Sequence, residues 1–391
     1  MITHPRFFNA VLSAFLIPAA TISVAQPSLD YVTGKALFEK QWVFAPASTG
    51  ASDGLGPYFN ARSCNQCHPG GGRGDADVSL TLHINDPVYG EQLQKFTRPG
   101  VPAEADASVT WSDPRITGTL RSASVAITDL HYGPLASNDM SLRIAPSLAG
   151  LGVLESIPES VLEQLEDPDD VDGDGISGRL PRLLDGRIGR FGWKASQPDL
   201  REQAGRALSL DLGLGNPVRT SVHGDCTPAQ VDCLASPGGA GGNGLEVSEQ
   251  VLDLLLTYIR DLPAPVPADF TAESIQRGAG LFAGIGCTGC HVPGLEVDGS
   301  ILAAYTDLLL HDMGPGLADS LAEGAAAGYE WRTPPLWGLD RTTGGYLHDG
   351  RARNLQEAIL WHDGEAAPAR QAYLDLNGAE RGDVITFLDG L

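Results

Sequence analysis

The fold expected for this chain is set by two short segments, Cys64-Asn65-Gln66-Cys67-His68 and Cys287-Thr288-Gly289-Cys290-His291. In each segment two thiols stand three positions apart, so they lie along one turn of helix. There each thiol can add to one vinyl group of the same porphyrin, and the adjoining histidine can reach the iron. This spacing is the attachment signature of c-type haem. The sequence therefore predicts two covalently bound haem c groups, with His68 and His291 as proximal iron ligands.

Other uses of paired cysteines explain these segments less well. A zinc site would need further cysteine or histidine ligands nearby, and a redox dithiol needs no histidine after each pair. The third pair, Cys226 and Cys233, lacks both the spacing and the histidine, and it lies in a loop rich in glycine and proline. In an oxidising compartment these two cysteines most simply form a local disulfide, the alternative being a redox-active thiol centre.

The first 25 residues have the pattern of an export signal. Arg6 precedes an apolar stretch over residues 7–22, and Ser23-Val24-Ala25 offers small residues at the positions that a signal peptidase recognises. A membrane anchor is the alternative, but the apolar run is short and is broken by Pro18. No other segment approaches 18 uncharged apolar residues, so we expect a periplasmic protein with no membrane span in its mature chain.

Composition limits the partners of this protein. The 391 residues carry 26 Lys and Arg against 49 Asp and Glu, which gives a formal net charge of -23. Binding to nucleic acid is driven by counter-ions that Lys and Arg displace from phosphates, so an acidic chain is not expected to bind it. The hydrophobic fraction of 42% is ordinary for a globular protein, and the length predicts two or three domains.

The chain repeats itself around the two haem motifs. Residues 34–38 (GKALF) are matched by 278–282 (GAGLF), and each opens an amphipathic stretch ahead of a haem motif. Two more matches follow in the same order along both halves, pairing residues 143–151 with 332–339 and residues 200–204 with 355–358. A common order of this kind indicates a duplicated unit.

We predict a mainly α-helical protein with two cytochrome c-like domains, each with one covalent haem. A small β insertion in the first domain is predicted for residues 78–130, where Thr, Val and Leu alternate with polar residues and turn formers. Residues 263–267 (PAPVP) are the best domain boundary, because a proline-rich segment is stiff and this one has no apolar periodicity. The predicted parts are a signal peptide at 1–25, an N-terminal haem c domain at 26–262, a linker at 263–269 and a C-terminal haem c domain at 270–391.

The motifs resemble those of the bacterial di-haem cytochrome c peroxidase and MauG-like superfamily. The resemblance rests on the paired haem motifs, on residues 332–336 (RTPPL), on residues 346–351 (YLHDGR) and on the helix that follows to His362. Residues 189–195 (GRFGWKA) and the pair Glu365-Ala366 are similar to its di-haem oxidoreductase branch, also called thiol oxidoreductases. The resemblance covers nearly all of the mature chain and implies electron transfer between two haems and a peroxidase-type centre.

The resemblance also implies which residues bind iron on the distal side. His362 occupies the helix position where these peroxidases carry the distal ligand of the second haem; Met313 is the other candidate, and a surface histidine is the plain alternative. Counting along the repeat, the counterpart of His362 is Ala207, which cannot bind iron, so the first haem is expected to keep an open distal position. His83 is a rival sixth ligand there, unless it is only a strand residue.

Three further residues take expected roles from the same resemblance. Asp211 falls where these peroxidases place a distal glutamate that assists O–O cleavage, although an aspartate is shorter. Trp193 corresponds to a tryptophan that relays electrons between the haems; its alternative is core packing with the indole N–H bonded. His348 is expected to form a hydrogen bond with a haem propionate or with the backbone.

A calcium motif is also present. Asp170, Asp172 and Asp174 stand at alternate positions before Gly175, as carboxylates do in calcium loops. A full EF-hand would have a glutamate at the twelfth position, where this chain has Pro181. We expect either a Ca²⁺ ion held with help from elsewhere or an acidic surface turn.

Together these features predict a periplasmic di-haem c-type oxidoreductase of peroxidase type. Electrons would pass from the C-terminal haem to an open N-terminal haem that reacts with peroxide or a related oxidant. The expected partners are a small redox protein of cytochrome or cupredoxin type and a small-molecule oxidant. The alternative is a non-catalytic di-haem electron-transfer cytochrome in which both irons are six-coordinate.

Overall fold

The computed structural model describes residues 27–50, 52–113, 119–239, 244–267, 271–297, 299–342 and 344–391. The predicted signal peptide at residues 1–25 lies outside the described residues, as does the end of the predicted linker. Within the described ranges, no helix is both long and apolar enough to cross a membrane.

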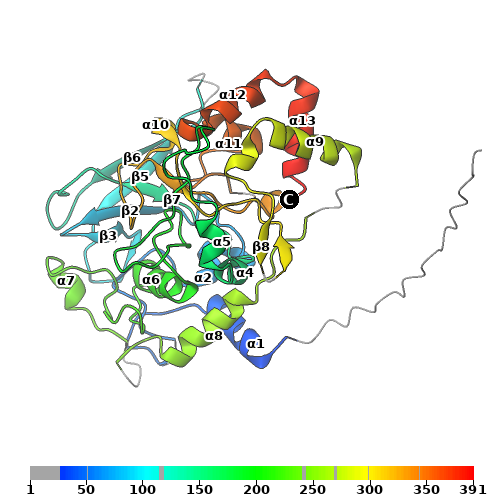
Figure 1. Ribbon diagram of the computed structural model, residues 1–391. Helices are drawn as coiled ribbons and strands as arrows, with labels where there is room; N and C mark the ends of the chain where they lie inside the picture. The colour runs from blue at the N-terminus through cyan, green and yellow to red at the C-terminus, as the bar shows by residue number, and fades with distance from the viewer. Residues whose placement is uncertain are drawn as a thin grey trace, which may run out of the picture.

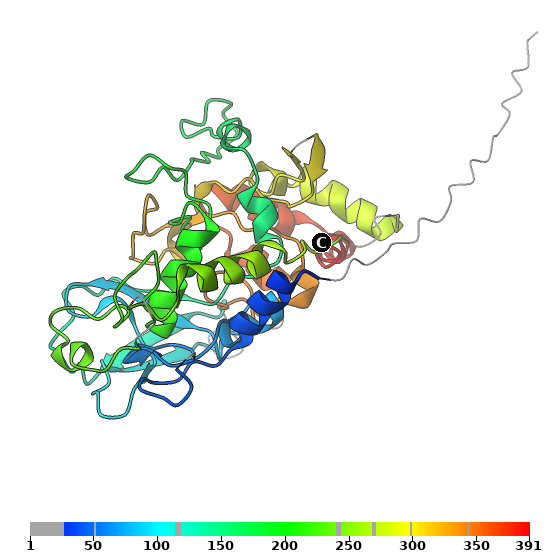
Figure 2. The same cartoon turned by 90° about the horizontal axis from the view of Figure 1, so that it is seen from below.

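Four of the longer helices form two similar pairs, one pair in each half of the chain. In the first half α1 (Leu29–Glu39) packs along α8 (Glu249–Arg260), and in the second half α9 (Glu273–Gly284) packs along α13 (Gly378–Leu388). Both views show α1 beside α8, with α9 and α13 together near the C-terminus (Figures 1 and 2).

Each pair approaches closely because a glycine stands in the contact. A Cβ atom on Gly34 of α1 would lie 2.1 Å from the backbone oxygen of Leu254 in α8. A Cβ atom on Gly278 of α9 would lie 2.1 Å from the backbone oxygen of Asp383 in α13. These two glycines begin the matched segments GKALF and GAGLF, so the sequence repeat places the same close helix contact in both halves.

Besides these pairs, one further helix occurs once in each half of the chain. Helices α6 (Leu200–Leu212) and α11 (Leu355–Trp361) start with the same cap. The side chain of Asp199 accepts a hydrogen bond from the Glu202 backbone N–H, and the side chain of Asn354 accepts one from Glu357 (both 2.8 Å). The matched leucines at the start of α6 and α11 therefore occupy the same helix position.

The other helical elements are short and connect these pairs. They are α2 (Cys64–Cys67), α4 (Leu151–Glu155), α5 (Glu159–Glu163), α7 (Val231–Leu234), α10 (Gly314–Leu317), α12 (Ala367–Asp375) and the 3₁₀ turns η1 (Pro69–Gly71), η2 (Cys287–Gly289), η3 (Leu339–Arg341) and η4 (Gly364–Ala366).

The strands are short, and those described form five small antiparallel sheets. In the three-stranded sheet, β2 (Thr81–Asp86) lies between β3 (Gly90–Leu93) and β7 (Ser141–Arg143). This register sets His83 of β2 opposite both Gln92 and Ser141. The remaining sheets pair β1 (Tyr58–Phe59) with β4 (Phe96–Thr97), β5 (Asp106–Trp111) with β6 (Ala123–Thr128), β8 (Leu295–Val297) with β9 (Ser300–Leu302), and β10 (Leu310–Asp312) with β11 (Glu330–Arg332).

The prediction of a mainly α-helical protein is wrong, because the structure is 31% helical and 15% strand. Strands β2 to β6 lie within the predicted insertion at residues 78–130, but β1 precedes it and β7 to β11 follow it. Strands of two or three residues are too short to show an alternating pattern in the sequence. They form only when distant segments pair, as Leu310 does with Arg332. The domain division at residues 263–269 stays a prediction.

The apolar core of the described residues has three main clusters, and two cavities lie between them. The first cluster includes Phe38 and Leu255, the second includes Ile144 and Trp193, and the third includes Phe282 with other residues of α9, α11 and α13. Side chains of the first two clusters line one cavity, and side chains of the last two line another. The second cluster therefore separates two cavities.

The close contact of α9 with α13 gives a matched pair of stability predictions. Gly278→Ala should lower the free energy of unfolding by about 1–3 kcal/mol, because the added methyl group overlaps a backbone oxygen. Gly280→Ala, two positions along the same helix, meets nothing within 4 Å and should raise it by about 1 kcal/mol. Denaturant unfolding of the two purified variants measures both changes, and equal effects would contradict the role assigned to Gly278.

Candidate functional site

Each cysteine-histidine motif opens onto its own cavity. The first cavity has a volume of about 620 Å³ and is lined by Cys64, Cys67 and His68 among others. The second has a volume of about 720 Å³ and is lined by all three motif residues of the other segment. Most of the lining is apolar in both cavities, as is usual for sites that hold a large flat ligand.

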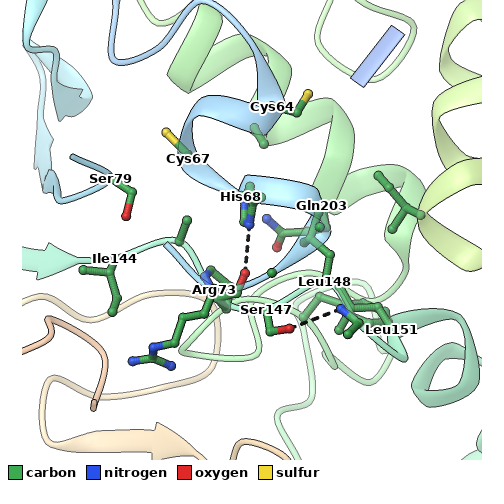
Figure 3. A pocket seen from close by; sticks show the side chains of 18 of the residues that line it. Cys64, Cys67, His68, Arg73, Ser79, Ile144, Ser147, Leu148, Leu151 and Gln203 are labelled. Carbon is green, nitrogen blue, oxygen red and sulfur yellow. Dashed lines mark hydrogen bonds between the residues drawn. The ribbon is translucent and has the colours of Figure 1, made fainter. Parts of the chain in front are cut away.

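The first motif is built on the single turn α2. The Ser63 side chain caps this turn by accepting a hydrogen bond from the Gln66 backbone N–H (3.2 Å). His68 follows directly, and its Nδ1–H donates to the backbone oxygen of Pro146 (2.8 Å), drawn as a dashed line in Figure 3. This bond leaves Nε2 of His68 as the free nitrogen, which is the usual arrangement of a histidine that binds a metal.

The second motif has the same arrangement and a second histidine facing it. Nδ1–H of His291 donates to the backbone oxygen of Tyr305 (3.1 Å), and Nδ1–H of His362 donates to the backbone oxygen of Ala358 (2.7 Å). The ring centres of His291 and His362 are 6.4 Å apart. A metal–imidazole bond is about 2.0 Å and the ring centre lies about 1.1 Å further on, so one metal ion fits between these two rings.

The surroundings of the four motif cysteines disfavour the thiolate form. Burial raises the pKa of Cys64, Cys67 and Cys287 to about 12, and burial also raises the pKa of Cys290. Thiolates are the reactive form in zinc sites and redox dithiols, and these surroundings disfavour them. Burial likewise lowers the pKa of the His68 and His291 imidazoles to about 4, so both are neutral at pH 7 and can bind a metal.

Trp193, Arg73 and Arg332 line both cavities and form the wall between them. The indole N–H of Trp193 donates to the backbone oxygen of Ile144 (2.9 Å), and the Arg73 guanidinium lies 5.1 Å from the indole ring centre. The backbone N–H of Arg332 donates to the oxygen of Trp193 (3.0 Å), and its Nε donates to Gly192 (3.0 Å). The wall is therefore held rigidly on both sides of the indole.

The two arginines of this wall keep positive charge between the cavities. Arg73 donates to the backbone oxygens of Gly345 (3.1 Å) and Leu347, and Arg332 also donates to Thr333 (3.1 Å). Burial lowers the pKa of both guanidiniums to about 10, which still leaves them charged at pH 7. Neither forms an ion pair with a carboxylate in the part of the chain described here, so their charges suit the propionates that every haem carries.

The first cavity also contains Asp211, Ala207 and His83, whose roles the sequence left open. Asn60 Nδ2 lies 3.3 Å from the Asp211 carboxylate and donates to it, and Gln92 donates to it as well. Burial raises the pKa of Asp211 above its usual range. Ala207 lies in α6 and offers no ligand atom to the cavity.

In the second cavity, Met313 and His348 accompany His362. Met313 is the residue before α10, and both sequence candidates for the distal ligand therefore reach the same cavity. The ring of His348 stacks on Trp331 with ring centres 3.7 Å apart. Burial lowers the pKa of His348, so its ring is neutral in this stack.

His311 is a charged residue of the second cavity that the sequence analysis did not single out. One ring nitrogen donates to Glu365 (2.9 Å) and the other donates to Asp307 (2.8 Å), so His311 is an imidazolium between two carboxylates. Despite its burial, these bonds raise the pKa of His311 to about 12. Nδ1 also lies 3.6 Å from the sulfur of Cys290. The sequence contained a signal for this residue, because its partner Glu365 belongs to a motif of the resemblance and His311 lies two positions before the candidate ligand Met313.

The disulfide and the acidic loop are the remaining predicted features, and of their residues Asp174 borders the second cavity. The structure joins Cys226 and Cys233 in a disulfide with a Cα–Cα distance of 6.3 Å. Asp170, Asp172 and Asp174 place one carboxylate oxygen each within 4.8 Å of the others, in an exposed loop. The binding of calcium by this loop stays a prediction.

Comparison with known proteins agrees with a site of this kind. A family model described as "Di-haem oxidoreductase, putative peroxidase" matches residues 6–86 and 132–391, and the unmatched residues 87–131 contain β3 to β6. No curated protein matches the sequence. Among solved structures, xenon-pressurised hydrazine synthase from Kuenenia stuttgartiensis is similar over 100% of both chains, with 15% identity and a TM-score of 0.37. A likeness at that level carries no argument about this chain.

The two cavities, each lined by two cysteines and a neutral histidine, fit a protein that holds two haem groups. Because the family model covers nearly the whole chain, the protein belongs to the di-haem oxidoreductase family. It is an oxidoreductase with haem as its cofactor, and the family relates it to peroxidases.

The charged state of His311 predicts how stability depends on pH. Its pKa is higher in the folded state than in the unfolded state, so its contribution is complete below pH 6.5 and is lost as the pH rises toward 12. Between pH 7 and 10 the free energy of unfolding should fall more steeply in the wild type than in His311→Gln, by up to about 1.4 kcal/mol per pH unit.

The same substitution leaves Asp307 and Glu365 without their cation, so at pH 6 it should cost about 3–5 kcal/mol. His223→Gln is the control, because His223 is bonded to a backbone oxygen away from both cavities. Denaturant unfolding at several pH values measures the slopes, and parallel slopes for the wild type and His311→Gln would show that His311 is not charged.

Proposed function

We propose that the protein is an exported, periplasmic di-haem c-type oxidoreductase of peroxidase type. One haem would be attached to Cys64 and Cys67 and the other to Cys287 and Cys290. Electrons would pass from the second haem to the first, where hydrogen peroxide or a related oxidant reacts. The proposal gives the two haems different tasks, and the contents of the two cavities support that difference.

The observation that carries the proposal is the asymmetry of the two cavities. In the second cavity His362 faces His291 at a ring-centre distance of 6.4 Å, so two protein ligands suit one six-coordinate iron. In the first cavity the matched position is Ala207, which has no ligand atom. An iron with one protein ligand keeps a position for a small oxidant, and an iron with two is suited to electron transfer.

The facing rings favour His362 over Met313 as the distal ligand of the second haem. The free nitrogen of His362 is fixed by the bond from Nδ1 to Ala358, as it is in both motif histidines. Met313 lines the same cavity, but no ring contact of this kind fixes it. A histidine at this position also lowers the reduction potential relative to methionine, which suits an electron donor to the first haem.

When bound, each haem supplies a redox-active iron that exchanges one electron at a time. All other roles in this proposal belong to side chains of the protein. His68, His291 and His362 hold neutral imidazoles toward the cavities, and the two arginines of the dividing wall offer positive charge to the propionates. Trp193 touches both cavities, so we propose it as the electron relay between them.

The acidic surface supports a small electron-transfer protein as the donor or acceptor. Asp174 and Ile176 of the acidic loop border the second cavity, where electrons would enter. A cytochrome or cupredoxin with a basic face would be guided there by a protein whose formal net charge is -23. This docking does not need the loop to bind calcium.

Covalent haem attachment can be tested directly. Mass spectrometry of the mature protein purified from the periplasm should show two added haem groups per chain. Cys287→Ala combined with Cys290→Ala should remove one of them, and Cys64→Ala combined with Cys67→Ala the other. The Cys226→Ser and Cys233→Ser pair is the matched control and should keep both haems. One haem or none on the wild-type chain would refute the assignment.

The asymmetry predicts the result of His362→Gly. Loss of one of two iron ligands should convert a low-spin ferric EPR signal into a high-spin signal, and it should leave the signal of the first haem unchanged. A shift of the second haem's reduction potential should accompany the change. Met313→Leu is the control and should leave the spectrum as it is. Two low-spin haems inert to peroxide in the wild type would favour a simple electron-transfer cytochrome instead.

A further inference from the structure

His311 is a buried cation beside the sulfur of a motif cysteine, and the proposed function gives it no role. Its Nδ1 lies 3.6 Å from Sγ of Cys290, and a carboxylate oxygen of Asp307 lies within 4.8 Å of the same sulfur. The side chains of His311 and Asp307 are only 2% and 3% exposed. Solvent therefore screens these charges little, and they act strongly on groups beside them.

The hydrogen bonds of His311 show that its ring is charged. Nδ1 donates to Glu365 (2.9 Å) and Nε2 donates to Asp307 (2.8 Å). A neutral imidazole has a single N–H group, so only an imidazolium can make both bonds to carboxylates. The three side chains together carry one net negative charge, with the positive charge in the middle.

The cation is held in place by a segment far away in the sequence. The hydroxyl and the backbone N–H of Ser177 donate to the two carboxylate oxygens of Glu365 (2.9 and 3.1 Å). A Cβ atom at Gly178 would lie 2.8 Å from Cε1 of His311, so the ring packs directly on that backbone. Movement of the cation away from Cys290 would therefore disrupt several contacts at once.

The charge of His311 acts on the Cys290 sulfur. Burial raises the pKa of the Cys290 thiol, and His311 opposes that rise more strongly than either Asp307 or Glu365 adds to it. The contribution of the nearest charge is therefore the largest of the three at this sulfur, and it is positive. In a c-type haem this sulfur is bonded to a substituent of the porphyrin, so the same charge acts on the haem.

A positive charge near a haem favours the reduced state, because ferrous iron carries one positive charge fewer than ferric iron. Three groups of the second site act in the opposite direction. Ligation by His362 lowers the reduction potential relative to a methionine ligand, and the negative charges of Asp307 and Glu365 also favour ferric iron. His311 counteracts all three.

We propose that His311, held between Asp307 and Glu365, raises the reduction potential of the second haem so that a donor protein can reduce it. This inference rests on the proposed function and deepens it. Arg73 and Arg332 do not duplicate the effect, because the propionates assigned to them balance their charge. His311 acts through its charge and is not an iron ligand, so it is a positioning residue and not a catalytic one.

The test measures the reduction potentials of haem-loaded proteins at pH 7 by optical redox titration. His311→Gln should lower the potential of the second haem, because the cation is lost and both carboxylates remain. Glu365→Gln should raise it, because a negative charge is lost while the amide oxygen still accepts from His311. Opposite signs distinguish a charge effect from a loosened structure. Glu365→Gln also decides the question alone if His311→Gln does not fold.

Two further variants identify the signal and control for charge. The transition of the second haem is the one that Cys287→Ala combined with Cys290→Ala removes. Arg277→Gln is the matched control, because Arg277 also lies between two carboxylates, Glu273 (3.1 Å) and Asp383 (2.8 Å), but is exposed and outside both cavities. Solvent screens its charge, so its loss should leave both potentials unchanged.

Both shifts should occur with the low-spin ferric EPR signal intact, because neither substitution removes an iron ligand. An unchanged or lowered potential in Glu365→Gln would overturn the inference, and so would an unchanged or raised potential in folded His311→Gln. Conversion of the low-spin signal to high-spin would also overturn it, since ligand loss would then explain the shift. A wild-type chain without haem on Cys287 and Cys290 would instead refute the proposed function.

Discussion

The geometry of both cavities depends on one kind of interaction, a hydrogen bond from histidine Nδ1 to a backbone oxygen. It occurs at His68, His291 and His362, and in each case it leaves Nε2 as the nitrogen that can bind a metal. Pro146 lies 78 residues along the chain from the histidine that it orients, and Tyr305 lies 14 residues from its histidine. The short strands beside those segments therefore help to build the site as well as the core, to which β7 contributes Leu142 and β8 contributes Leu295.

The wall between the two cavities contains two charged side chains at buried positions, where apolar side chains would be more stable. Arg73 and Arg332 are bound by backbone oxygens, and they flank the buried indole of Trp193. A buried cation is stabilised by nearby anions, and Asp349 and Asp307 act in this way on Arg73 and Arg332.

The two cysteine-histidine motifs could be recognised from the sequence, because haem attachment requires particular residues at a fixed spacing. The sequence could not locate features that depend on pairing between distant segments. The wall between the cavities, for example, depends on the bond from the backbone N–H of Arg332 to the oxygen of Trp193, which joins residues far apart in the sequence. The same reason explains the wrong expectation of a mainly helical fold, since strands such as β10 exist only through their partners. Arg73 stands in a glycine-rich run directly after the first motif, and nothing in that run predicts its position between the cavities.

The asymmetry of the two haem sites comes from where a helix ends. Helix α11 stops at Trp361, so the backbone oxygen of Ala358 lacks a partner within the helix, and the side chain of His362 takes its place. Helix α6 continues past Ala207 to Leu212, and there the corresponding oxygen is used by the helix itself. A histidine placed at position 207 alone would not find the bond that orients His362. The two copies of the repeat therefore differ in backbone geometry as well as in one residue.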